Sequence, residues 1–274
     1  MKEEVRMIST THKPQRIRYA IKVRRLTVSH IEDLSASLRA ITFSADDLQD
    51  FQSDGFDDHI TVFFPHADGQ LVLPQIGEKG VSFPEGAIKP AVREYTPTGI
   101  DIANNRLRLE FAIHDAGPAT TWAKQVKIGE QIGIAGPRSA LVLPMDAKDY
   151  VLIGDETALP AIRRRLSQLP AGVTAHVFAE IDSEVDQVPL PSAAQVKVVW
   201  AYRRGAEATS AHFLLQEVQK ATLPKTDVQV WMGCEREQVR ALREWFCENG
   251  WDKEDVKHAS YWNKGVAAYH EPHD

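Results

Sequence analysis

The sequence has only two cysteines, Cys234 and Cys247, among its 274 residues. Two thiols cannot build a disulfide framework, and they cannot supply the four ligands of a thiolate zinc or iron–sulfur site. A reducing compartment such as the cytosol fits this scarcity best. If the chain transfers electrons, we therefore expect a bound organic cofactor to carry them.

Long apolar runs and an excess of positive charge are also missing. The longest apolar stretches, such as residues 196–202, fall far short of the about 20 residues that a membrane span needs. The first 25 residues are polar and basic, with no apolar run of signal-peptide length. The net charge is −6, from 32 Lys and Arg against 38 Asp and Glu, which argues against a dedicated nucleic-acid binder. The sequence thus predicts a cytoplasmic protein with no nucleic-acid and no membrane partner.

Several common motifs are absent from the sequence. It has no Gly-Lys dipeptide for a Walker-type phosphate loop, no Gly-x-Gly-x-x-Gly and no Gly-x-Ser-x-Gly. An acidic stretch with Asp50 as calcium-loop position 1 places Gly55 correctly at position 6, but Thr61 stands at position 12, where an EF-hand needs Glu. We interpret this stretch as a solvated acidic loop. His270 and His273 lie in a polar tail without further zinc ligands.

Residues 1–147 have the pattern of a β-domain. Alternating apolar and polar residues predict a strand at 16–24. Further strands are predicted at 38–44, 60–64, 107–113 and 131–135. Glycines and prolines separate them, and many short strands with such turn signals favour a closed antiparallel β-barrel. One short helix is expected at 118–126.

Residues 148–274 alternate between strand and helix patterns. Strands are predicted at 150–153, 173–181, 196–202 and 228–232, and helices at 158–168, 210–221 and 236–249. The last helix is amphipathic and ends before Gly250, a favoured C-cap residue. Strand–helix alternation predicts a parallel sheet. We therefore expect two domains, an antiparallel β-barrel at 1–147 and a parallel-sheet α/β domain at 148–274.

The first candidate binding element is Arg93-Glu94-Tyr95-Thr96. If this segment is a strand, Arg93 and Tyr95 face the same side because side chains alternate. An Arg offers a planar, permanently charged donor fork for a diphosphate, and a Tyr offers a flat ring for an aromatic cofactor. A surface Arg beside a half-buried Tyr is the alternative interpretation.

The second candidate element runs from His114 to Ala123, through a Gly117-Pro118 turn into a helix. Proline is favoured at the first helical position. The small residues that follow leave backbone N–H groups open, and a helix N-terminus attracts phosphate. An ordinary helix entry is the alternative.

These motifs, in this order, resemble those of the siderophore-interacting proteins, ferric-siderophore reductases related to the ferredoxin-NADP reductase superfamily. The main matching motifs are Arg-x-Tyr-Thr at 93–96, His-x-x-Gly-Pro-Ala-Thr-x-Trp-Ala at 114–123 and Gly-Pro-Arg at 136–138. Further matching segments lie at 56–65, 154–161, 231–235 and 261–265. The resemblance covers roughly residues 15–265.

The resemblance implies that the barrel binds FAD. The residues it assigns to cofactor binding are Arg93, Tyr95, Thr96, His114, Gly117, Ala119, Thr120, Thr121, Trp122, Arg138, Asp155, Thr157 and Trp262. Among them, Arg93 and Thr121 would hold the pyrophosphate together with the helix start. Tyr95 would pack on the isoalloxazine, and Thr96 would lie near its reactive N5.

The resemblance also implies a ferric siderophore or other ferric chelate as substrate, with NADPH or a ferredoxin as electron donor. The sequence Arg-Glu-Tyr-Thr-Pro at 93–97 favours the branch of the family that uses NADPH. Arg138 and Lys264 are implied as a basic substrate pocket. The family often has a third cation, a Lys, where this chain has Thr61, and His59 or His66 could compensate.

The nucleotide-binding half offers weaker signals. Asp155 and Thr157 follow a strand and precede a helix, at the kind of strand end where α/β sheets bind ligands. We expect Thr157 to cap the helix, and the acids there to cap or shape the loop rather than to touch phosphate. Arg203 and Arg204 either meet the 2′-phosphate of NADPH or form a solvated basic turn.

The two cysteines have different expected roles. Cys234 begins a helix, where thiolate character is possible; it either lines the nicotinamide side or is an ordinary buried cysteine. Cys247 lies in the middle of a helix and is expected in the core.

The expected mechanism needs no nucleophile–base pair, because the cofactor carries the chemistry. Electrons from NADPH pass through FAD to the ferric chelate, and weakly bound Fe(II) leaves. The alternatives are a general flavin or quinone reductase on the same scaffold, and a non-enzymatic siderophore or haem carrier. The Arg-x-Tyr-Thr segment argues against the carrier.

Overall fold

The computed structural model describes residues 13–77, 80–114, 117–209 and 212–266. The contacts divide the chain into two compact units, one of Gln15–Val142 and one that contains the described residues from Leu143 onward. No helix in these described ranges is long and apolar enough to cross a membrane. His270 and His273, the residues considered for zinc, lie outside the described residues.

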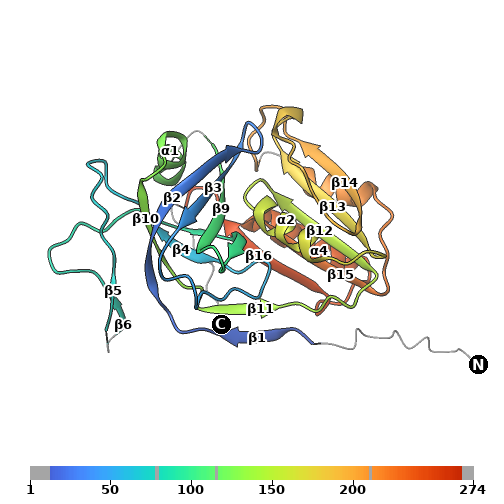
Figure 1. Ribbon diagram of the computed structural model, residues 1–274. Coiled ribbons are helices and arrows are strands. Elements are labelled where there is room, and N and C mark those ends of the chain that lie inside the picture. The colour runs from blue at the N-terminus through green and yellow to red at the C-terminus, as the bar shows by residue number, and fades with distance from the viewer. Residues whose placement is uncertain (1–12, 78–79, 115–116, 210–211, 267–274) are drawn as a thin grey trace, which may run out of the picture. The chain divides into compact units, whose positions relative to one another are not determined.

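The first unit is built around a seven-stranded antiparallel sheet in the order β7-β4-β10-β2-β3-β9-β8. Its strands are β2 (Val23–Asp33), β3 (Leu38–Ser44), β4 (Ile60–Phe63), β7 (Val92–Tyr95), β8 (Pro97–Asp101), β9 (Arg106–Ala112) and β10 (Gln131–Ala135). Two small sheets pair β1 (Gln15–Arg18) with β11 (Ser139–Val142), and β5 (Gln75–Gly77) with β6 (Gly80–Ser82). The β5–β6 hairpin extends away from the curled sheet in Figure 1. The single helix of this unit in the described residues is α1 (Pro118–Gln125).

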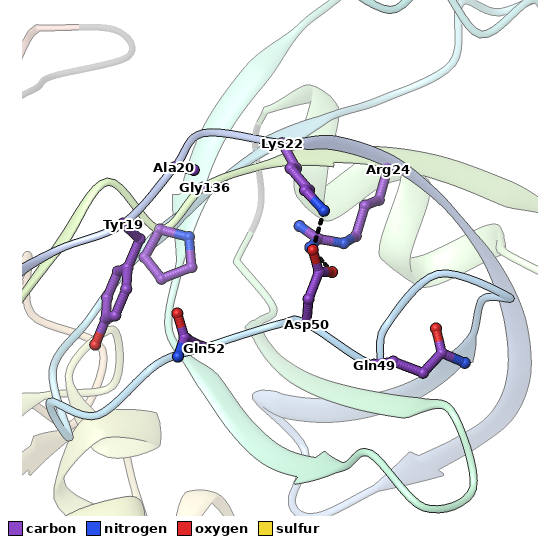
Figure 2. A pocket seen from close by; sticks show the side chains of 9 residues that line it. Tyr19, Ala20, Lys22, Arg24, Gln49, Asp50, Gln52 and Gly136 are labelled. Atoms are coloured by element: carbon purple, nitrogen blue, oxygen red, sulfur yellow. Dashed lines mark hydrogen bonds and ion pairs between the residues drawn. The ribbon is translucent and has the colours of Figure 1, made fainter.

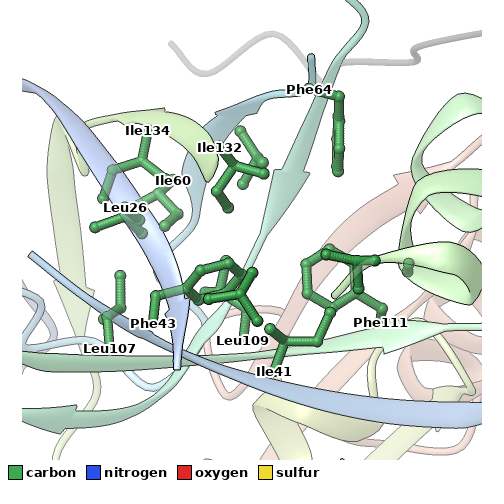
Figure 3. Packing of buried hydrophobic residues seen from close by; sticks show 14 of the residues in the cluster. Leu26, Ile41, Phe43, Ile60, Phe64, Leu107, Leu109, Phe111, Ile132 and Ile134 are labelled. Carbon is green, nitrogen blue, oxygen red and sulfur yellow. The ribbon is translucent and has the colours of Figure 1, made fainter. Parts of the chain in front are cut away.

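The predicted antiparallel β-domain is confirmed, as a curled sheet. Strands β7 and β8 are the two edge strands of the sheet, yet only Thr96 separates them in the sequence. The sheet must therefore curl until its two edges approach each other at Thr96. Buried aliphatic and aromatic side chains fill the space enclosed by the curl, as Figure 3 shows. Each fully buried side chain of this kind contributes about 1.5–3 kcal/mol relative to an exposed one.

The prediction of one strand over 16–24 is wrong. Strand β1 ends at Arg18 and pairs with β11, whereas β2 begins at Val23 and pairs with β3 and β10. The apolar–polar alternation continues across the break, because a period-2 pattern reports which side chains face inward and not which strand lies alongside. The acidic stretch is also only partly solvated, since Asp58 is buried and accepts hydrogen bonds from Ser53 and Gly55.

The second unit contains a five-stranded parallel sheet in the order β14-β13-β12-β15-β16. Its strands are β12 (Asp149–Asp155), β13 (Thr174–Ile181), β14 (Gln195–Tyr202), β15 (Val228–Glu235) and β16 (Val256–Trp262). Its helices are α2 (Leu159–Gln168), the short η1 (Glu184–Asp186), α3 (Phe213–Lys220) and α4 (Arg236–Glu248).

The parallel sheet confirms the predicted alternation, with two differences. The sequence patterns do not predict β16 as a strand, because most of its side chains are only half-buried and its apolar signal is weak. The helix predicted from residue 210 begins at Phe213, and residues 210 and 211 lie outside the described part of the chain.

The strand order contains a reversal next to the central strand. From β12 the chain moves outward to β13 and β14, and it then returns to the other side of β12 for β15 and β16. In open α/β sheets, ligands bind beyond the carboxyl ends of the strands at this kind of reversal. Asp155 ends β12 and Glu235 ends β15. These two acids therefore mark the expected ligand-binding edge of the second unit.

Candidate functional site

Arg93 and Tyr95 lie two residues apart on β7. Tyr95 pairs in register with Ile60, and Arg93 pairs with Val62, so the two side chains leave the same face of the strand as predicted. The Tyr95 ring lies 4.4 Å from the ring of Phe111, between centroids. Burial raises the pKa of the Tyr95 hydroxyl. The ring is thus a fixed, neutral surface beside a cation.

Thr96 lies at the corner where the two edges of the curled sheet approach each other. Its side chain is buried, with 7% of the residue exposed. Arg93, three residues earlier, donates from Nη1 to the carbonyl oxygen of Val92 at 2.7 Å. This bond engages one nitrogen of a guanidinium group that has five N–H donors.

Gly117 fixes the entry into helix α1. It has a φ of +118°, a conformation that glycine adopts without strain and other residues rarely reach. The amide of Thr121 donates to the carbonyl of Gly117 at 2.9 Å. The amides of Ala119 and Thr120 belong to the first turn, where N–H groups have no acceptor inside the helix. Because the first turn contains no acidic residue, this helix start suits an anion.

If Thr121 binds the pyrophosphate as predicted, it must do so through its hydroxyl, because its amide already donates to the Gly117 carbonyl. The Thr121 side chain is exposed, whereas Ala119 and Thr120 are buried. The carbonyl of His114, upstream of the turn, accepts a hydrogen bond from Lys124 at 3.0 Å, and the residue itself is exposed. Two residues of the same motif, 115 and 116, lie outside the described residues.

Trp122 packs within an aromatic cluster inside the curled sheet. Its ring centroid lies 5.4 Å from Phe64, 5.7 Å from Phe111 and 6.4 Å from Phe43. The indole Nε1 is buried and has no hydrogen-bond partner. An unsatisfied buried donor costs about 1–3 kcal/mol. This orphaned donor lies on the helix whose first turn is open, and it fits a site where a bound molecule supplies the acceptor.

The first unit has a cavity of about 260 Å³ whose lining includes Gly136 and Pro137. Figure 2 draws the side chains that line it. The buried Arg24 donates to Asp50 at 2.7 Å, and Lys22 forms an ion pair with the same carboxylate. Two cations against one acid leave the lining with a positive balance. Sequence reasoning missed these residues because the alternation over 16–24 places Arg24 among the polar positions, whereas in the structure it begins the buried row of β2 that continues with Leu26 and Val28.

The residues expected to bind substrate are exposed but differently engaged. Arg138 follows Pro137 on the loop beside this cavity, and its carbonyl accepts from the amide of Tyr19 at 2.9 Å. The proposed compensating histidines have other contacts: His59 lies 3.7 Å from Glu94, and His66 contacts the carbonyl of Ile88 at 3.1 Å. Neither observation assigns either histidine to a substrate.

Asp155 is a buried acid of the second unit that accepts three hydrogen bonds. It is 1% exposed and accepts hydrogen bonds from the amide and hydroxyl of Thr157 at 2.9 and 2.5 Å, and from Trp262 Nε1 at 2.7 Å. Burial, and then the nearby charge of Glu156, raise its pKa to about 6. The predicted capping role of Thr157 is wrong, because Ala158 is the N-cap of α2 and Asp155 occupies the Thr157 hydroxyl.

Arg203 and Arg204 have opposite environments. Arg203 is nearly buried and pairs with both carboxylate oxygens of Glu156, at 2.7 and 2.5 Å. It also lies 3.3 Å from Glu180. Arg204 is exposed and pairs with Glu184 at 3.1 Å. The interpretation as a solvated basic turn therefore fits Arg204, whereas Arg203 is committed to two acids.

Glu180 is a buried acid that sequence reasoning missed. It is 0% exposed and pairs in register with Asp155 on the neighbouring strand. Burial, and then the charge of Asp155, raise its pKa to about 8. One carboxyl oxygen, Oε2, is buried without a hydrogen-bond partner. The available signal was a glutamate within the apolar end of β13, residues 177–181.

The cysteines differ from the predictions in part. Cys234 is buried, as the ordinary interpretation expected, and burial raises its pKa well above the usual value. It is therefore a thiol at neutral pH, without the thiolate character that a helix start can give. The core placement of Cys247 is wrong, because this residue is only half-buried on α4.

The two strand-end acids hold the segment that contains Lys264. Asp155 accepts from Trp262, and Glu235 accepts from the Lys264 amide at 3.3 Å while it caps α4. The Lys264 ammonium group is exposed and contacts Glu207 at 2.7 Å. The structure thus brings Asp155, Trp262 and Lys264 together at one edge of the parallel sheet. Within the described ranges, no group of His, Cys, Asp and Glu has the arrangement of a metal site.

Comparisons with known proteins agree with this geometry. The family model for a siderophore-interacting FAD-binding domain matches residues 27–141, and that for a siderophore-interacting protein matches residues 147–265. An NADPH-dependent ferric-chelate reductase from Escherichia coli is 33% identical over 260 residues, covering 94% of this chain and 99% of the relative.

Solved structures give the same answer for the fold. A siderophore utilization protein from T. fusca superposes with a TM-score of 0.87 at 29% identity, covering 94% of this chain and 99% of that one. The cytochrome b5 reductase domain of Ulva prolifera nitrate reductase, at 12% identity, shares the fold alone with a TM-score of 0.60 and covers 87% and 97% of the two chains. The chain belongs to the siderophore-interacting protein family.

Proposed function

We propose that this protein is an FAD-dependent ferric-chelate reductase that takes electrons from NADPH and releases iron as Fe(II) in the cytosol. Residues 1–147 form its FAD-binding domain and residues 148–274 its NADPH-binding domain. The observation that carries the proposal is that one chain of this family combines three features. The first unit has a strand with a cation and an aromatic ring, Arg93 and Tyr95 on β7, and a helix, α1, whose first turn is open to an anion. The second unit has a reversal of strand order in a parallel sheet.

The residues of the first unit fit an FAD. Arg93 and the open amides of Ala119 and Thr120 supply donors for its pyrophosphate. Tyr95 offers its ring to the isoalloxazine, and Trp122 offers the orphaned indole N–H. FAD, when bound, accepts two electrons together and passes them on singly, which is the chemistry that joins a hydride donor to a ferric ion.

Exposed cations elsewhere in the chain are proposed to bind the ferric chelate. Arg138 and Lys264 provide exposed positive charge for anionic ferric chelates, and Lys22 adds a further cation at the cavity beside the Arg138 loop. Lys264 must exchange Glu207 for the chelate, which requires little free energy because an exposed ion pair is weak in water. A ferredoxin is the alternative electron donor.

Anaerobic mixing tests the proposal directly. The purified protein should bind FAD and show flavin absorbance, NADPH should bleach that absorbance, and a ferric chelate should then restore it while a ferrous-specific dye reports Fe(II). A protein that ignores added FAD would contradict the whole scheme. Bleaching by reduced ferredoxin but not by NADPH would replace the donor, and faster turnover of quinones than of ferric chelates would replace the substrate.

Substitution of the exposed cations tests substrate binding separately. Arg138→Ala and Lys264→Ala should raise KM for a ferric chelate several-fold while the rate of flavin reduction by NADPH stays unchanged. Arg106→Ala, which removes an exposed cation from β9, is the matched control and should leave KM unchanged. Equal KM values for all three variants would remove these two residues from the substrate site.

A further inference from the structure

The ligand-binding edge of the second unit is unusually acidic for its proposed ligand. The guanidinium group of Arg203 pairs with Glu156 and Glu180, and Asp155 lies beside Glu180 as its register partner. If all three carboxyl groups were ionised, the cluster would have a net charge of −2. The phosphates of a nicotinamide dinucleotide are also negative, so an ionised cluster would repel the ligand that this edge is proposed to bind.

The geometry shows where a proton reduces that charge. Asp155 and Glu180 are register partners on adjacent strands and both are almost completely buried. Two carboxylates that share a buried site cannot both ionise easily. Asp155 accepts three hydrogen bonds that stabilise its charge, whereas Glu180 accepts one, from Arg203 to Oε1 at 3.3 Å, and its Oε2 has no partner. Glu180 is therefore the member of the pair that retains a proton.

The other groups around Glu180 do not replace this proton. Arg203, which follows β14, donates to both oxygens of Glu156 at 2.7 and 2.5 Å and reaches Glu180 only at the longer distance of 3.3 Å. From β15, Cys234 is a neutral buried thiol, and the charge of Glu235 is met by the backbone amides at the start of α4. The cluster contains no second buried cation among the residues that the structure describes.

We propose that Glu180 sets the affinity for the nicotinamide dinucleotide through its proton: the ligand binds the form of the cluster in which Glu180 is neutral, and at alkaline pH binding takes up one proton from solvent. This inference rests on the proposed NADPH-binding role of the second unit. Neutral Glu180 leaves the cluster at −1, and Arg203 becomes better able to turn towards a phosphate because fewer carboxylates compete for it.

The direction of the pH effect follows from the raised pKa of Glu180, about 8 in the free protein. Below pH 7 the proton is already present, so affinity does not depend on it. Above pH 8 the free protein loses the proton, and each bound ligand must restore it. Affinity should then fall by up to about tenfold per pH unit. The 2′-phosphate of the ligand is already dianionic above pH 7, since its second pKa is about 6.

Titration calorimetry of the FAD-loaded protein with NADP⁺ tests the inference without turnover. In the wild-type protein the Kd should rise about tenfold from pH 7 to pH 9. At pH 8.5, the binding heats in two buffers of different ionisation enthalpy should reveal proton uptake. Glu180→Gln, which keeps the neutral form at every pH, should lose both effects and bind more tightly than wild type at pH 9. A gain in affinity distinguishes this role from simple damage to the fold.

The matched control is Glu184→Gln, an exposed acid on η1 that should retain the wild-type profile. A wild-type Kd that is constant from pH 7 to pH 9, without proton uptake, would overturn the inference, as would an unchanged pH slope in Glu180→Gln. The wild-type calorimetry remains decisive if the variant does not fold. Failure of NADPH to bleach the flavin at any pH would instead overturn the proposed function itself.

Discussion

The two units of this protein present opposite charges where they are proposed to meet anionic ligands. The antiparallel unit offers Arg93, an open helix start without acids, and a cluster of aromatic rings. The parallel unit offers buried carboxyl groups at the ends of β12, β13 and β15. The first arrangement attracts phosphate directly, at any pH. The second can accept phosphate only if part of its negative charge is neutralised, which makes its binding sensitive to pH.

The largest expected effect concerns the direct arrangement. Arg93→Ala should raise the Kd for FAD about 100-fold, because charge-assisted hydrogen bonds contribute about 1.5–3 kcal/mol. Fluorescence titration of the apoprotein with FAD measures this change. Arg106→Ala is again the control, since it removes an exposed cation from the same sheet. An unchanged FAD affinity in Arg93→Ala would contradict the claim that the first unit binds phosphate directly through this cation.

The second effect concerns stability and pH. Folding raises the pKa of Glu180 to about 8, so the folded protein binds this proton more tightly than the unfolded chain. The resulting stabilisation is fully present below the unfolded pKa and is lost as pH rises through 8. Each unit of pKa difference corresponds to about 1.4 kcal/mol. The Tm should therefore fall from pH 6 to pH 9, and Glu180→Gln should reduce that fall. Scanning calorimetry of the wild-type protein and of Glu180→Gln measures the Tm of each from pH 6 to pH 9. An equal fall of Tm in the two proteins would contradict the assignment of the raised pKa to Glu180.

The third effect compares a glycine from each unit. A Cβ on Gly154 would lie 2.6 Å from the Ala158 Cβ and 2.8 Å from the Gly233 carbonyl, neither of which can move easily. Gly154→Ala should therefore cost about 1–3 kcal/mol of unfolding free energy. A Cβ on Gly99 would lie 3.2 Å from the Arg108 Cβ, so Gly99→Ala should cost less. Urea unfolding of both variants measures the difference, and equal costs would show that the carboxyl end of β12 tolerates more than its packing suggests.

The smallest effect concerns the cavity beside Gly136 and Pro137. Lys22→Ala should change the unfolding free energy by less than about 1 kcal/mol, because its ion pair with Asp50 is exposed. It should raise KM for anionic ferric chelates only a few-fold. The buried Arg24 shares the same acid, so Arg24→Ala should destabilise the fold more. A larger stability loss for Lys22→Ala than for Arg24→Ala would reverse this interpretation of the cavity.

Local signals were sufficient wherever function depends on one continuous segment. The Arg93-x-Tyr95 spacing predicted a shared face, and the register of β7 confirms it. Gly117 followed by proline predicted the start of α1, where the structure places it. Each of these features is decided by backbone conformation over a few residues, so a short stretch of sequence contains the information.

Local signals failed where a role depends on the neighbouring strand. Thr157 has the chemistry of a helix cap, but its hydroxyl donates a hydrogen bond to Asp155 instead. Arg203 has the chemistry of a phosphate ligand, but two acids hold it, and one of them lies on β13, more than twenty residues away in sequence. No pattern within the segment 203–204 could indicate these partners.

The sequence by itself determined the two-unit β and α/β architecture, the family, and the shared face of Arg93 and Tyr95, because period-2 and strand–helix patterns and short motifs are local properties. The tertiary structure decided the electrostatics of the edge that is proposed to bind the nucleotide. Parallel pairing places Glu180 beside Asp155, and burial in a common site raises the pKa of both carboxyl groups. A pKa depends on desolvation and on charges within a few ångströms, and only the packed sheet specifies those.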